Sequence, residues 1–191
     1  SPKLGEKILR PAIELFAGIP SVVYGWVGLS VLVPFIRKYV GGLGFSLLAG
    51  GIVLTIMIFP TITSIASDSL RSLSNDYKEA SYALGATRWQ TIKNVLLPAA
   101  MPNILTGVVL GMARAFGEAL AVQMVIGNSI KFPSNLLDST TTLTSAITMD
   151  MGNTVAGSAW NNALWSMALL LLIISFCFIL IIRKISSRGR N

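Results

Sequence analysis

The stretch of sequence that decides the fold is Trp160–Ile182, WNNALWSMALLLLIISFCFILII, which contains no charged residue. A helix of about 20 apolar residues is long enough to cross the hydrocarbon core of a bilayer. Because lipid offers no partners for backbone N–H and C=O groups, a spanning segment must satisfy them within its own helix. Trp160–Ile182 is therefore predicted to be a transmembrane helix, covering residues 160–182.

Three further apolar runs precede this segment, over residues 19–36, 43–65 and 101–126. The whole chain is 53% hydrophobic and 12% charged, whereas soluble domains carry about 25% charged residues. These features predict an all-α fold: a polytopic transmembrane helical bundle with about four spans, in a single domain covering residues 1–191.

The connections between the predicted spans differ in composition. Residues 66–98 form a polar segment. Residues 128–159 form a long connection rich in Thr, Ser and Asn, within which residues 143–151 are apolar enough for a short helix at the membrane surface.

Basic residues indicate the orientation of the bundle. Four spans place both termini and residues 66–98 on one side, which carries eleven Lys and Arg residues against three on the other. An excess of basic residues marks the cytoplasmic side, so residues 66–98 are predicted to be cytoplasmic and residues 128–159 extracytoplasmic. The net charge of +7 is thus explained by the orientation of the protein in the membrane, and it does not indicate nucleic-acid binding. The eleven are Lys3, Lys7, Arg10, Arg71, Lys78, Arg88, Lys93, Arg183, Lys184, Arg188 and Arg190, and the three are Arg37, Lys38 and Lys131.

The composition provides few residues of the types that act in catalysis. The chain has no histidine, and its single cysteine, Cys177, lies within an apolar run. No cofactor and no metal site are predicted. The glycine-rich residues 41–51 lack the Gly-Lys-Ser/Thr ending of a phosphate-binding loop, so the chain is not expected to bind or hydrolyse ATP. An intramembrane enzyme stays open as an alternative of a different class.

The polar segment is predicted to contain two short helices. Asp76 with Glu79 has the spacing of a capping box that would open a helix over 76–84. Gly85 follows where a left-handed C-terminal residue is expected. The alternative is an amphipathic loop lying on the membrane surface.

A second helix is predicted over 88–96. Thr87 and Gln90 form another capping box at its start, and Pro98 is expected to end it. Apolar side chains would form one ridge on each helix. The ridges comprise Tyr77, Ala80 and Leu84 on the first helix, and Trp89, Ile92 and Leu96 on the second.

The same segment resembles the EAA motif of the permease subunits of ABC importers. Ser81 stands where that motif usually has a second Ala, and Val95 where it usually has Ile. In the family this motif docks in a groove of a cytoplasmic ATPase subunit, so the resemblance implies an ATPase partner, acting as a homodimer. The positions implied in coupling to the ATPase are Glu79, Ala80, Gly85, Val95, Leu97 and Pro98.

Two further segments narrow the resemblance to phosphate importer permeases. They are residues 17–25, AGIPSVVYG, and residues 114–122, RAFGEALAV. The continuation over residues 123–128, QMVIGN, is more similar to the PstC-type than to the PstA-type subunit. The resemblance implies a multi-pass subunit of the bacterial or archaeal cell membrane, with a PstA-type second permease and an extracytoplasmic phosphate-binding protein as partners. Because such permeases have about six spans, the chain is expected to be N-terminally truncated.

Charged and small residues inside the third predicted span indicate a site. Arg114 and Glu118 are four residues apart and would share one face of a helix over 101–126. Intramembrane charges usually face a bundle interior or a watery path. Gly107 and Gly111 form a Gly-xxx-Gly pattern that permits close helix packing. Arg114 and Glu118 are therefore candidates for a translocation path, and the alternative is an ion pair that only locks helices together.

These features predict the permease subunit of an ATP-driven importer of inorganic phosphate. The EAA motif does not distinguish phosphate from phosphonate, molybdate or an amino acid as the substrate. A channel that works without an ATPase is the remaining alternative.

Overall fold

The computed structural model describes residues 11–188, without the side chains of residues 181, 182 and 185–188. Four basic residues counted for the orientation lie outside this range: Lys3, Lys7, Arg10 and Arg190. All regular elements within the described range are helical, apart from one isolated bridge between Gly127 and Thr140. The fold is therefore all-α, as predicted.

The described chain divides into two compact units. One is built on Phe59–Ala113, and the other on Gly18–Ile58 and Arg114–Cys177. The boundary between them falls within three long helices. The helices are α2 (Ser21–Val27), α3 (Val33–Tyr39), α4 (Leu47–Arg71), α5 (Asp76–Ala83), α6 (Arg88–Thr91), α7 (Leu97–Phe116), α8 (Leu120–Ile126), α9 (Leu143–Asp150) and α10 (Ala159–Arg188).

Among the described residues, three helices are long and apolar enough to cross a membrane: α4, the continuous helix Arg88–Phe116, and Ala159–Leu180 within α10. The first predicted span, 19–36, corresponds to the helix Ser21–Tyr39. It reaches the required length and apolarity only together with the preceding helix Pro11–Gly18, as one broken span. Counted in that way, the described residues contain up to four candidate spans by length and composition, and the sequence predicts about four.

The second span differs from its predicted bounds of 43–65. Three glycines with positive φ keep residues 41–44 out of a helix, and Ser46 caps α4 by accepting the Ala49 N–H at 3.2 Å. At its other end α4 continues to Arg71, into the predicted loop, because residues 66–71 include no Gly or Pro to stop it. The three glycines are Gly41, Gly42 and Gly44.

The helix Ser21–Tyr39 contains a π-helical turn over Gly28–Leu32, in which the Val33 N–H donates to the Gly28 carbonyl. Such a wide turn accommodates Pro34, which lacks an N–H and would crowd the carbonyl four residues earlier. Gly28 also sits in tight packing, because an added Cβ would lie 2.8 Å from Val53 Cγ2 and 2.9 Å from Val125 Cγ1.

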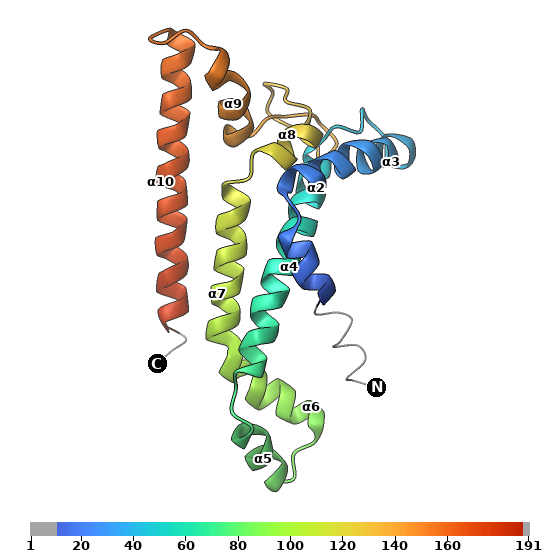
Figure 1. Cartoon of the computed structure of the whole chain (residues 1–191), viewed down its shortest axis with the longest axis vertical. Helices are drawn as coiled ribbons and strands as arrows, with labels where there is room; N and C mark the ends of the chain where they lie inside the picture. Colours follow the sequence, from blue (N-terminus) through green and yellow to red (C-terminus); the bar gives the residue numbers. More distant parts are fainter. Residues whose placement is uncertain (1–10, 189–191) are drawn as a thin grey trace. The chain divides into compact units, whose positions relative to one another are not determined.

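The buried core of the second unit joins residues from three helices, α3, α4 and α8. α2 and α8 lie side by side in this unit (Figure 1). The short helix predicted over 143–151 is present as α9. The core residues are Val33, Ile36, Ala49, Val53, Ala121 and Val125.

Candidate functional site

The first candidate site is the knuckle, which we define as residues 74–96, containing α5 and α6. Gly85 ends the first helix in the left-handed conformation predicted for it, with φ of +78°. The Gly85 N–H donates to Tyr82 O at 2.9 Å and the Ala86 N–H to Ser81 O at 3.1 Å. These two bonds form a Schellman motif, which satisfies carbonyls that the helix end would otherwise leave unpaired.

The start of α5 differs from the prediction, and the capping box assigned to Asp76 and Glu79 is absent. Asn75 is already helical and makes no side-chain capping bond. Ser74 acts one residue earlier, because its Oγ accepts the Asp76 N–H at 3.2 Å. Asp76 and Glu79 instead lie in the first turn of the helix, where negative charge is favourable beside the helix dipole.

The second predicted capping box is confirmed. The Thr87 N–H donates to Gln90 Oε1 at 2.8 Å, and the Gln90 N–H donates to Thr87 Oγ1 at 3.4 Å. Both residues satisfy N–H groups at the start of α6 that would lack partners within the helix.

The sequence predicts that the helix beginning at Arg88 ends at Pro98. This prediction is wrong, because the helix continues through Pro98. A π-helical turn over Ile92–Leu96 is followed directly by α7, and the Leu97 N–H donates to Ile92 O. The wider turn gives the proline ring room beside the preceding carbonyls. The second helix of the knuckle and the third membrane span are therefore one continuous helix, Arg88–Phe116.

A contact that the sequence did not predict joins the two helices of the knuckle. The hydroxyls of Ser81 and Thr91 lie 3.0 Å apart, and both residues are buried. Thr91 Oγ1 also contacts Thr87 O at 3.1 Å. The only signal in the sequence was the polar Ser81 at a position where the EAA motif usually has Ala.

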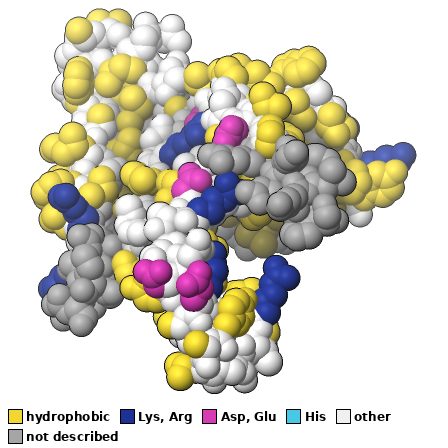
Figure 2. All heavy atoms as spheres, turned by 60° about the horizontal axis from the view of Figure 1, so that its bottom comes forward, with side chains coloured by type: hydrophobic (Ala, Val, Ile, Leu, Met, Phe, Trp, Pro, Cys, Tyr) yellow, Lys and Arg dark blue, Asp and Glu magenta, His cyan; other side chains and the backbone are white. Residues whose placement is uncertain are grey.

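Hydrophobic side chains are exposed on the knuckle. The predicted ridges are present in part, because Leu84 is 89% and Trp89 69% exposed, whereas Leu96 is buried. At this end of the molecule, yellow hydrophobic side chains lie among acidic and basic ones (Figure 2). The large exposed hydrophobic residues of the knuckle are Tyr77, Tyr82, Leu84, Trp89 and Ile92.

The other candidate coupling positions also lie at or near the surface. Glu79, Ala80, Leu97 and Pro98 are exposed, and Val95 is half-buried. The knuckle thus combines an ordered backbone with an exposed surface that includes these positions.

The second candidate site is the break between α7 and α8, where the structure corrects the prediction. α7 ends at Phe116 and α8 begins at Leu120, so Arg114 and Glu118 do not share a helix face. Gly117 is a poor helix former. The Ala121 N–H, which would bond the Gly117 carbonyl in a continuous helix, donates instead to Glu118 Oε1 at 3.0 Å.

Arg114 and Glu118 each lie at a helix end that suits their charge. Arg114 is in the last turn of α7, where positive charge is favourable, and the Glu118 carboxylate is bound at the start of α8. The break therefore explains how both charges are tolerated within an apolar part of the chain.

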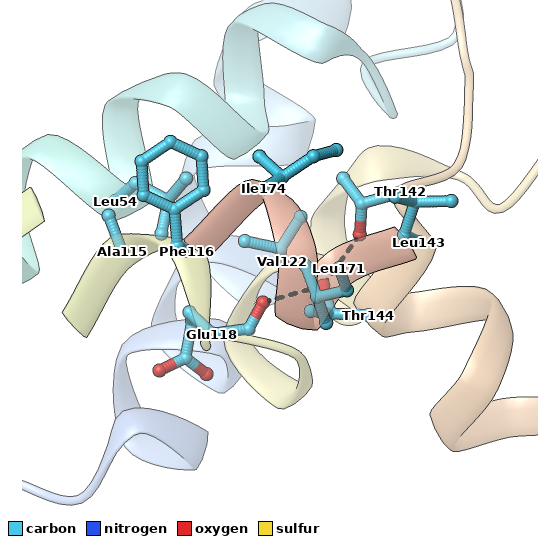
Figure 3. Close-up of a pocket in the computed structure, with 10 residues that line it drawn as sticks. All are labelled: Leu54, Ala115, Phe116, Glu118, Val122, Thr142, Leu143, Thr144, Leu171 and Ile174. Atoms are coloured by element: carbon cyan, nitrogen blue, oxygen red, sulfur yellow. Dashed lines mark hydrogen bonds between the residues drawn. The ribbon is translucent and has the colours of Figure 1, made fainter. Parts of the chain in front are cut away.

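Glu118 is held at its backbone as well. Its N–H donates to Ala115 O at 3.2 Å, and its carbonyl accepts a hydrogen bond from Thr144 Oγ1 at 2.9 Å. In Figure 3 the carbonyl faces Thr144 while the carboxylate points to the opposite side. The residue thus connects the end of α7, the start of α8 and the start of α9.

A pocket of about 340 Å³ lies beside Glu118 within the second unit (Figure 3). Most of its walls are apolar, and its polar groups come from Glu118, Thr142 and Thr144. This lining supplies no basic side chain, so the pocket is not suited to an anion. The apolar lining residues are Leu54, Ala115, Phe116, Val122, Leu143, Leu171 and Ile174.

α2 packs tightly against the start of α8. A Cβ added to Gly25 would lie 2.8 Å from Ala121 Cα, so the two backbones are in contact. The neighbouring Tyr24 lies near Arg114. No signal in the sequence of residues 17–25 placed this segment near Arg114.

Gly107 and Gly111 are both buried. A Cβ at Gly107 would lie 2.8 Å from Ile65 Cγ2, which places α7 and α4 in close contact within the first unit. Among residues 11–188, no group of three or more Cys, Asp or Glu side chains is placed to hold a metal ion.

Taken with the apolar helices, these features define a multi-pass helical membrane protein with a protruding, hydrogen-bonded knuckle. Residues 1–191 match the family described as binding-protein-dependent transport system inner membrane component, and the chain belongs to this family. It is thus a multi-pass membrane component, as predicted.

Curated relatives include permeases from bacteria and archaea. The chain is 62% identical to the probable ABC transporter permease protein YqgH of Bacillus subtilis, over 100% of this chain and 62% of that protein. It is 36% identical to the phosphate transport system permease protein PstC of Xylella fastidiosa, over 96% of this chain and 62% of that protein. The chain therefore spans 62% of the length of each of these two relatives.

A solved structure has the same fold. The match is to an inward-facing conformation of the MetNI methionine ABC transporter, with a TM-score of 0.72 and 23% sequence identity. It covers 99% of this chain and 77% of the other. This likeness supports the architecture and says nothing about the substrate.

Proposed function

We propose that this chain is the permease subunit of an ATP-driven ABC importer and that its substrate is inorganic phosphate. Membership of the family of binding-protein-dependent transport components supports the first part. The observation that carries the proposal is the continuous helix Arg88–Phe116, which runs from the knuckle to Arg114. The chain itself has no ATP-binding motif, so hydrolysis belongs to a partner subunit.

The knuckle is the docking element for the ATPase. Its exposed hydrophobic side chains offer apolar area to a partner, and its backbone is fixed by a Schellman motif and a capping box. A surface that is ordered before binding loses less conformational entropy when it docks. The coupling residues are Glu79, Ala80, Gly85, Val95, Leu97 and Pro98, of which the last two join the π-helical turn to α7.

Arg114 and Glu118 belong to the translocation path. An arginine guanidinium matches the oxygen atoms of phosphate with two parallel hydrogen bonds. Glu118 lies four residues further on and limits the positive potential that a bound anion would meet. Transport requires binding that is weak enough for release. The break between α7 and α8 places both charges at helix ends and not on one helical stripe.

The phosphate assignment is supported by the relatives. Besides the Xylella protein, a probable phosphate transport system permease protein PstC of Methanocaldococcus jannaschii is 32% identical over 91% of this chain. The importer would then contain a PstA-type second permease, a homodimer of the ATPase and an extracytoplasmic phosphate-binding protein.

The proposal is tested with the full-length permease assembled with its partners in lipid vesicles. We expect ATP-dependent accumulation of labelled phosphate that excess phosphonate, molybdate or methionine does not inhibit. Inhibition by one of these solutes would assign the importer to that solute instead. Phosphate flux that needs neither ATP nor the ATPase would show a channel and contradict the proposal.

A further inference from the structure

A hydroxyl from α9 holds the break between α7 and α8. Thr144 Oγ1 donates to the Glu118 carbonyl at 2.9 Å and so joins residues 26 positions apart in the sequence. The sequence predicts residues 128–159 as a connection, and nothing in it indicates a role for Thr144.

Thr144 is itself part of a hydroxyl cluster at the start of α9. Thr142 Oγ1 lies 3.0 Å from Thr144 Oγ1 and accepts the Ser145 N–H at 3.2 Å. Ser145 is fully buried, and its Oγ lies 2.8 Å from Thr142 Oγ1. Thr142 and Thr144 are half-buried beside it. A hydrogen-bond network whose members are satisfied is rigid, so the Thr144 hydroxyl is presented to Glu118 in a fixed place (Figure 3).

The contact acts on a residue that belongs to neither helix. The Glu118 carbonyl lies in the break, outside α7 and α8, and it accepts the hydrogen bond from Thr144 there. Its bond to Thr144 therefore fixes the peptide that carries the Glu118 side chain. The carboxylate in turn holds the Ala121 N–H, the second residue of α8.

We propose that Thr144 is a positioning residue: its hydrogen bond to the Glu118 carbonyl sets the break between α7 and α8 and thereby the place of the Glu118 carboxylate. The functional part of this inference rests on the proposed function, in which Glu118 belongs to an anion path. The structural part stands without it.

Thr144→Val removes the hydroxyl and keeps the branched shape of the side chain. Thr148→Val is a matched control, because Thr148 Oγ1 donates to Thr144 O at 2.8 Å within α9 alone. Thr144→Ser keeps the donor and should behave as the unaltered chain. The first readout is the hydrogen exchange of the Ala121 amide in the assembled complex, which does not depend on the identity of the substrate.

We expect Thr144→Val to accelerate this exchange by about fivefold or more, the factor that corresponds to the loss of one hydrogen bond. Thr148→Val and Thr144→Ser should leave it unchanged. Unchanged exchange in Thr144→Val, or equal acceleration in Thr148→Val, would overturn the proposal.

The second readout is ATP-driven phosphate uptake, measured with and without the Glu118 side chain. Thr144→Val should lower the maximal rate about tenfold in the unaltered background. In a Glu118→Ala background it should cause no further loss, because the group it positions is gone. The same fold-loss in both backgrounds would identify a purely structural role and contradict the proposal. An unaltered complex that moves no phosphate would refute the proposed function, while the exchange result would still decide the role of Thr144.

Discussion

The Oγ of Ser81 lies 3.0 Å from the Oγ1 of Thr91, and this buried contact joins the two helices of the knuckle. The two hydroxyls are not equivalent. Ser81 Oγ makes its hydrogen bond with Thr91 Oγ1. Thr91 Oγ1 has a second partner, the carbonyl oxygen of Thr87, at 3.1 Å.

This asymmetry predicts unequal effects of removing each hydroxyl. Ser81→Ala leaves Thr91 with a partner and should cost about 0.5–1.5 kcal/mol of stability. Thr91→Val leaves a buried hydroxyl on Ser81 without its partner and should cost about 1–3 kcal/mol. Thermal unfolding of the purified chain measures both. The double variant should be less destabilised than the sum of the two, and strictly additive costs would show that the hydroxyls do not interact.

Gly85→Ala tests the left-handed end of α5. No atom would lie within 4 Å of the new Cβ, so the only cost is the backbone conformation at φ of +78°. That cost is about 1–2 kcal/mol for a residue other than glycine. We expect weaker co-purification with the ATPase and faster proteolysis of the knuckle. Gly51→Ala, in open space within α4, is the control and should be neutral or stabilising. Equal behaviour of the two variants would argue against a strained turn.

Gly107→Ala tests the contact between α7 and α4. The added methyl would lie 2.8 Å from Ile65 Cγ2 and 2.9 Å from Ile65 Cβ, so the helices must separate. Overpacking of this kind costs about 1–3 kcal/mol. The measurement is unfolding of the detergent-solubilised protein. Gly50→Ala should be tolerated, because its nearest neighbours would be 3.7 Å away at ordinary contact distance. If Gly107→Ala leaves the stability unchanged, α7 and α4 are not tightly packed at this position.

Leu84→Ser separates docking from folding at the knuckle. Leu84 is 89% exposed, and such surface substitutions usually change stability by no more than about 0.5 kcal/mol. We expect normal folding and a loss of ATPase binding of at least about fivefold, measured by pull-down titration. Leu43→Ser changes an equally apolar side chain that is 70% exposed on the predicted extracytoplasmic side, and it should retain binding. Full ATPase binding by Leu84→Ser would place the docking surface elsewhere.

Local signals in the sequence predicted local structure well. Gly85, and Thr87 with Gln90, determine turns and caps through their own backbone and side-chain chemistry, and these features are present. The apolar runs likewise predicted the long helices, although α4 begins and ends later than expected. Such features depend on residues within a few positions of one another.

The wrong predictions concern places where contacts between distant residues, or an uncommon type of turn, determine the local structure. Pro98 normally ends a helix, but the π-helical turn before it removes the clash. Most residues in the run 101–126 are apolar, so the sequence does not reveal the helix break at Gly117. That break is stabilised by Glu118 with Ala121 and by Thr144 from another segment. The pairing of Ser81 with Thr91 is also non-local and could not be read from either helix alone.

The most direct test of the central claim compares Arg114→Ala, Arg114→Lys and the unaltered chain in ATP-driven phosphate uptake by the assembled complex. If Arg114 contributes to the anion path, Arg114→Ala should assemble with its partners and abolish uptake. Arg114→Lys should restore it only in part, because an ammonium group lacks the planar fork of the guanidinium. Normal uptake by a stably assembled Arg114→Ala complex would contradict the account.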